Sequence, residues 1–131
     1  MKVKIILSGL GLLGLVSCGV KTPPEQKGEP FGINIACAEF GNNFPGECGK
    51  DYGYPTVEDL KYWQEKGLSL IRMPFKWERL QHEPGGKLHS PDLQAIKDFV
   101  TAAERLDMKV ILDMHNYCRR YHNGKVQIIG Q

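Results

Sequence analysis

The sequence has 131 residues, which is enough for one small domain at most. Hydrophobic residues make up 41% of the chain, charged residues 24%, and the formal net charge is +2. Lys2 and Lys4 carry this excess, because without them the 17 basic residues become 15, equal to the 15 acids. A domain with such balanced charge is not expected to bind nucleic acid.

The first seventeen residues are predicted to direct export and not to belong to the folded domain. Two lysines start the chain, and the apolar run over residues 5–16 is too short to span a bilayer. The run ends in Leu15-Val-Ser-Cys18, which resembles the lipobox of bacterial lipoproteins, where the cysteine is lipidated and becomes the new amino terminus. We therefore predict a signal peptide over residues 1–17 and an exported protein anchored to a membrane by lipid on Cys18. An ordinary signal peptide cut near Ser17 and a buried strand are the alternatives.

A polar segment, a strand and a long loop are predicted next. Residues 18–30 are rich in proline and glycine and are typical of a tether. Residues 31–36 form the first predicted strand, and a loop over residues 39–55 follows it. Loops of this length are uncommon and often functional. Cys37 and Cys48 flank the loop and could form a disulfide in an oxidising compartment, with two reduced thiols as the alternative.

The remaining elements alternate between helix and strand. Thr56 predicts the start of a helix that ends near residue 66, and a second strand follows over residues 69–73, where Pro74 stops it. Ser90-Pro91 opens a longer helix, and residues 109–114 form a third strand. The apolar stripe of the longer helix consists of Leu93, Ile96, Val100 and Ala103, with Phe99 and Leu106 beside them. This order implies an α/β fold with parallel strands and right-handed crossovers.

Polar residues at the carboxyl ends of the predicted strands indicate a functional site. Strand alternation places Asp113 and His115 on one face of the third strand, and Arg72 of the second strand can converge with them. Asn34 of the first strand could join this group. Arg72 is either a structural ion pair with Asp113 or a fixed positive charge beside a catalytic carboxylate, and both can hold. For His115 the alternative is a histidine satisfied within the core.

His115, Cys118 and His122 are candidate metal ligands, because their spacing would place them on one face of a helix. The segment follows a strand, however, and Asn123-Gly124 is typical of a turn, so we expect no metal there and no cofactor.

Three aromatic residues, Trp77, Tyr117 and Tyr121, are candidates for stacking on sugar rings, with ordinary packing at the rim as the alternative. Trp63 is expected in the core. Acidic residues near the rim are expected to be solvated, namely Glu39, Glu78 and Glu83. We predict no catalytic carboxylate pair within this sequence.

Several segments, in order, together resemble glycoside hydrolase family 5, in the branch that holds many cellulases (endo-β-1,4-glucanases). These segments are residues 32–35, 54–56, 70–77, 85–86, 112–117 and 128–131. The resemblance implies an eight-stranded (β/α)8 TIM barrel that cleaves β-1,4-glucan internally, with retention, through two glutamates. The spacing of Cys37 and Cys48 also resembles a short disulfide loop of some relatives.

The resemblance assigns roles to individual residues. Arg72 corresponds to the arginine that braces the nucleophile, and His115 to the histidine that contacts the sugar at the cleavage point. Asn116 and Tyr117 are expected along the substrate cleft, together with Trp77. The family's two glutamates follow the fourth and seventh strands, whereas this sequence supplies three strands and two helices of the barrel.

We therefore expect residues 31–131 to be the amino-terminal part of a barrel, inactive alone, from a monomeric endoglucanase anchored at the cell surface. The alternative is a non-catalytic lipoprotein that binds glucan or is a remnant.

Overall fold

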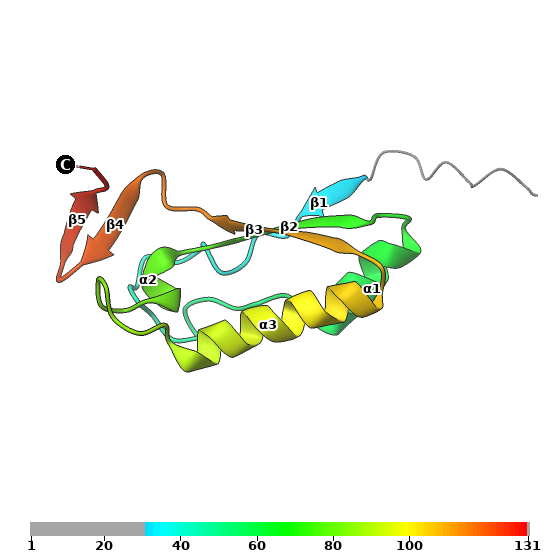
Figure 1. Cartoon of the computed structure of the whole chain (residues 1–131), viewed down its shortest axis with the longest axis horizontal. Helices are drawn as coiled ribbons and strands as arrows, with labels where there is room; N and C mark the ends of the chain where they lie inside the picture. The colour runs from blue at the N-terminus through cyan, green and yellow to red at the C-terminus, as the bar shows by residue number, and fades with distance from the viewer. Residues whose placement is uncertain (1–30, 131) are drawn as a thin grey trace, which may run out of the picture.

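The structure, a computed structural model, describes residues 31–130, so the predicted signal peptide, the tether and Cys18 lie outside the described residues (Figure 1). Three parallel strands form the main sheet in the order β1-β2-β3, and helices cover one of its faces. The strands of this sheet are β1 (Gly32–Asn34), β2 (Leu70–Phe75) and β3 (Lys109–Met114). The helices are α1 (Val57–Glu65), α2 (Trp77–Leu80) and α3 (Ser90–Arg105). An antiparallel hairpin of β4 (Arg119–His122) and β5 (Lys125–Ile128) lies beyond the carboxyl end of β3.

Helix α1 forms where its capping residues predict it. The Thr56 side chain accepts the backbone N–H of Asp59 while the Asp59 carboxylate accepts that of Thr56, which completes a capping box. Leu60 is fully buried beneath the helix. Gly67, with φ of 82°, ends the helix in a left-handed conformation that glycine adopts readily. The predicted helix is confirmed.

The core lies between the sheet and the helices on its covered face. Ile71 and Met73 of β2 are fully buried there, and Phe99 and Ala103 of α3 belong to the same core cluster. Arg72 lies on the opposite face of β2, as the alternation predicts. The strand order and the two-faced pattern of β2 are confirmed, and no helix within residues 31–130 is long and apolar enough to cross a bilayer.

Strand β2 continues through Pro74, contrary to the prediction that this proline stops it. The carbonyl of Pro74 accepts the Cys37 thiol at 3.6 Å, so the backbone of Pro74 faces the side on which β1 lies. Pairing with β1 ends at Arg72, so no ladder bond is lost when Pro74 lacks an N–H.

Two further elements were not predicted, the short helix α2 and the hairpin β4–β5. The Asn123-Gly124 turn was anticipated, and it joins the two hairpin strands, with φ of 48° and 72° at its residues. These φ values are the ones that a two-residue hairpin turn requires. The strands on either side escaped prediction because they are four residues long and mostly polar.

Candidate active site

Four side chains meet at the carboxyl end of the sheet, on the face that the helices leave uncovered. Arg72 forms an ion pair with the Asp113 carboxylate and donates to the side-chain oxygen of Asn34. The Nδ1 atom of His115 lies 2.9 Å from Asp113 Oδ2 and 3.0 Å from an Arg72 nitrogen. The predicted convergence of Arg72, Asp113, His115 and Asn34 is confirmed, and the structural ion pair considered for Arg72 is present as well.

The surroundings of His115 favour one arrangement of its protons. A carboxylate is a stronger acceptor than an imidazole, so we assign a hydrogen to Nδ1, which donates to Asp113. Nε2 then accepts the Tyr117 hydroxyl at 2.8 Å, and the two rings lie edge to face with centroids 4.5 Å apart. Tyr117 itself is largely exposed and has φ of 51°. His115 is thus oriented from both sides, which a site needs if the imidazole is to meet a substrate in one pose.

Lys76 was not predicted to belong to the site. Its ammonium group donates to the His115 carbonyl at 2.7 Å and lies 5.7 Å from the centre of the Tyr117 ring. It therefore adds a positive charge beside the aromatic ring at the rim.

Glu78 was expected to be a solvated charge, and this prediction was wrong. The side chain is 4% exposed, and its carboxylate accepts the side-chain amide of Asn116 at 2.8 Å and the backbone N–H of Tyr121. Glu78 lies in α2, which follows β2, and its carboxylate is directed toward the segment after β3, which supplies both donors. Sequence periodicity could not reveal this because α2 is one turn long.

Asn116 lines a cavity beside Tyr117, and its side-chain amide is hydrogen-bonded within the protein. It is 8% exposed, its oxygen accepts the backbone N–H of Trp77 at 2.8 Å, and its nitrogen donates to Glu78 and to the Arg119 carbonyl. The amide is used to hold α2 against the segment after β3. Asn116 is therefore a residue that positions the rim.

Trp77, predicted to stack on a sugar ring, also makes contacts within the protein. The Arg120 guanidinium lies over its ring at 4.5 Å, and the indole N–H donates to Gln81 at 2.8 Å. One ring face is therefore covered by protein. Trp63 packs against the core, as expected.

A cavity of about 380 Å³ opens beside the His115 cluster. Phe44, Tyr117 and Tyr121 supply aromatic surface to its wall, and Lys76 and Arg119 supply positive charge. The rings of Phe44 and Tyr121 are 5.3 Å apart. Tyr117 and Tyr121 thus line this cavity, and their stacking on a sugar ring stays a prediction.

The cysteine and metal predictions are also addressed by the structure. Cys37, Cys48 and Cys118 are free thiols, so the predicted disulfide is absent and the reduced alternative is the one observed. Burial raises the pKa of the Cys37 thiol to about 11. Within residues 31–130, His115, Cys118 and His122 are not brought together as a ligand group.

Comparison with known proteins identifies the family. The family model described as cellulase (glycosyl hydrolase family 5) matches residues 25–129. The chain belongs to glycosyl hydrolase family 5. The α/β barrel class predicted from the sequence is thereby confirmed, with the three parallel strands as part of it.

Curated relatives of this chain are named as endo-β-1,4-glucanases. A probable endo-β-1,4-glucanase B of Aspergillus oryzae is 38% identical over 98 residues, covering 73% of this chain and 29% of that protein. Endo-β-1,4-glucanase A of Emericella nidulans is 33% identical over 95 residues, covering 71% and 29%.

Solved structures give the same result. XacCel5A in complex with cellopentaose and the Pseudomonas stutzeri endoglucanase Cel5A in complex with cellobiose each have a TM-score of 0.70 and 40% identity over 78% of this chain. The chain spans 32% and 30% of those two proteins, and under a third of the curated relatives.

Proposed function

We propose that this protein is an endo-β-1,4-glucanase and that the described residues supply the arginine–histidine side of its substrate cleft. The cluster of Arg72, Asp113 and His115 at the carboxyl ends of β2 and β3 carries the proposal. This is the end of a (β/α)8 barrel at which active sites are built. Family membership and the names of the relatives support the substrate class.

The geometry suits a retaining glycosidase mechanism. Such enzymes use two carboxyl groups about 5–5.5 Å apart, one as nucleophile and one as acid/base. A fixed guanidinium such as that of Arg72 favours the ionised form of a neighbouring carboxylate, which a nucleophile must be. We expect His115 and Tyr117 to contact sugar hydroxyls in the cleft, and we assign neither catalytic glutamate to a residue of this sequence.

We also propose that the protein is exported and held at a membrane by lipid on Cys18. The basic start, the short apolar run and the small residue before Cys18 support this proposal. A surface location suits an enzyme whose substrate is a polymer.

The test of the activity uses the protein translated from the complete gene, with carboxymethyl-cellulose and cello-oligosaccharides as substrates. We expect Arg72→Ala and His115→Ala to lower turnover by about 10²–10³-fold, because each removes an oriented polar group from the cleft. Arg105→Ala and His122→Ala serve as matched controls and should leave turnover unchanged. Binding of glucan without hydrolysis in the unmodified protein would favour the non-catalytic alternative, and near-normal rates in both cleft variants would refute the assignment.

The anchor is tested by metabolic labelling with palmitate. Label should disappear in Cys18→Ala and persist in Cys118→Ala, whose thiol is exposed in the structure. Label that persists in Cys18→Ala would refute the lipoprotein proposal and leave the activity proposal untouched.

A further inference from the structure

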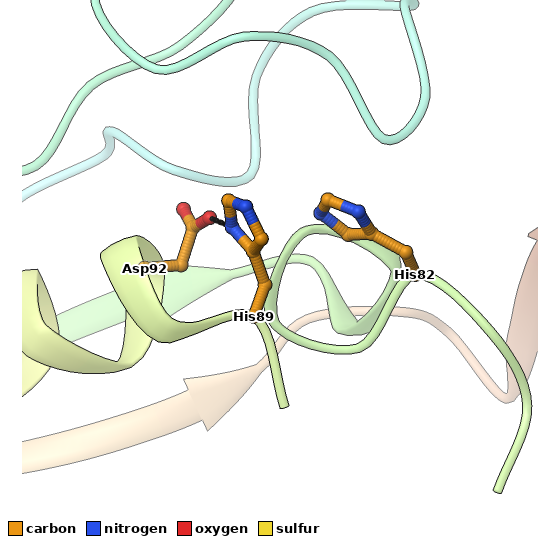
Figure 2. Close-up of side chains that lie close together, drawn as sticks. All are labelled: His82, His89 and Asp92. Carbon is orange, nitrogen blue, oxygen red and sulfur yellow. Dashed lines mark hydrogen bonds and ion pairs between the residues drawn. The ribbon is translucent and has the colours of Figure 1, made fainter. Parts of the chain in front are cut away.

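A second cluster of polar side chains lies away from the His115 site, at the amino terminus of α3. It consists of His82, His89 and Asp92, shown side by side in Figure 2. Each offers one ligand atom, and these atoms all lie within 4.8 Å of one another. Within residues 31–130, no other group of three such side chains is this close.

Asp92 is anchored as a metal ligand needs to be. The side chain is 1% exposed, and Oδ1 accepts the hydroxyls of Tyr52 at 2.7 Å and Tyr54 at 2.9 Å. Oδ2 lies 2.5 Å from His89 Nδ1, on the side that faces the two imidazoles. The tyrosines therefore fix the carboxylate by hydrogen bonds to one oxygen and leave the other oxygen directed toward the histidines.

His82 supplies the observation that points to a ligand. Its ring stacks on that of His89, with centroids 4.2 Å apart and planes at 28°. Its Nε2 atom is shielded from solvent and has no hydrogen-bond partner. A buried polar atom without a partner is costly and rare in native proteins, and an ion bound at that atom would remove the cost.

We propose that His82, His89 and Asp92 form a binding site for a zinc ion. Imidazole nitrogens and a carboxylate oxygen are ligands that zinc accepts, with a water molecule in the fourth tetrahedral position. The ion takes the place of the hydrogen between His89 Nδ1 and Asp92 Oδ2, and the neutral imidazole of His89 then carries its hydrogen on Nε2.

Binding requires only local movement. Ligand atoms about 2.1 Å from one tetrahedral ion lie roughly 3.4 Å apart. His89 and Asp92 must therefore separate slightly from 2.5 Å, and the His82 ring must turn out of the stack so that its lone pair meets the same ion. Both histidines belong to the connection between α2 and α3, so the ion would fasten this connection to α3. Through Tyr52 and Tyr54 it would also be linked to the long loop after β1.

The test is a calorimetric titration of ZnCl₂ into the full-length protein after treatment with EDTA. We expect one site and a rise in melting temperature with zinc. His82→Ala and His89→Ala should each lower the affinity by at least about 10-fold. His122→Ala, which removes a half-buried histidine outside the cluster, should leave the affinity unchanged.

His82→Ala is the decisive variant, because it leaves the bonds of buried Asp92 intact and should fold normally. A Co²⁺ spectrum separates this site from the free cysteines, because thiolate ligands give an intense charge-transfer band that nitrogen and oxygen ligands lack. Absence of binding, an affinity unchanged in His82→Ala and His89→Ala, or a thiolate band would each overturn the proposal. None of these results bears on glucanase activity.

Discussion

Replacing Glu78 by glutamine is expected to destabilise the protein although it changes one oxygen to an NH₂ group. The carboxylate is 4% exposed and accepts two donors, the Asn116 side chain and the Tyr121 backbone N–H. A glutamine has one side-chain oxygen, so one of the two buried donors would face an NH₂ group. An unsatisfied buried donor costs about 1–3 kcal/mol, a large part of the roughly 5–15 kcal/mol by which most domains are stable.

Urea unfolding followed by tryptophan fluorescence measures this cost. A loss of about 2 kcal/mol should move the unfolding midpoint down by roughly 1 M, because denaturant slopes for small domains are about 1–3 kcal/mol/M. Glu104→Gln, at an exposed position on α3, is the matched control and should change stability by less than about 0.5 kcal/mol. If both variants unfold at the same urea concentration, Glu78 does not hold the rim as argued.

Two further predictions concern single positions. Gly32→Ala should destabilise the protein by about 1–3 kcal/mol, because the added Cβ would lie 2.6 Å from the Leu70 carbonyl oxygen. The control Gly53→Ala adds a Cβ that meets nothing within 4 Å and should be tolerated. Equal melting temperatures of the two variants would contradict this prediction. Burial raises the pKa of the Cys37 thiol from 9.0 to about 11, so at pH 8 this thiol has about 100-fold less thiolate than an unperturbed one. Under reducing conditions, iodoacetamide should therefore label exposed Cys118 first and reach Cys37 only as the pH rises. Labelling of both at the same rate would show that Cys37 is not buried as described.

Local signals were sufficient for the elements that depend on nearest neighbours in the chain. Thr56 and Gly67 marked both ends of α1 because capping involves residues three or four apart. The alternation of β2 separated buried Ile71 from Arg72 because strand geometry fixes which face each side chain takes. The convergence of Arg72 with His115 followed once parallel strands were inferred, since their carboxyl ends share one edge.

The missed features depend on contacts between residues far apart in the sequence. Glu78 is buried because Asn116 and Tyr121 reach it from a segment some 40 positions later. Arg120 covers one face of the Trp77 ring for the same reason, and no local pattern indicates this contact. His82 and Asp92 meet across an irregular connection, where neither the helical nor the strand period applies.

The position of the polar cluster within the sheet follows from the kind of fold to which the sheet belongs. On the uncovered face of the sheet, Leu70 precedes Arg72 along β2. Along β3, Ile111, which pairs with Arg72, follows Lys109 and precedes Asp113 and His115. In a (β/α)8 barrel this face is the interior, which is filled by layers of branched apolar side chains. Ile111 is 48% exposed here, and β3 pairs with β2 alone within residues 31–130, so its other edge is open to a further strand. A strand added there would bury Ile111 and leave His115 at the carboxyl end, where a polar group keeps access to solvent and to a polymer. Asp113 and His115 thus lie at the carboxyl end of β3, which is the end at which a barrel builds its site.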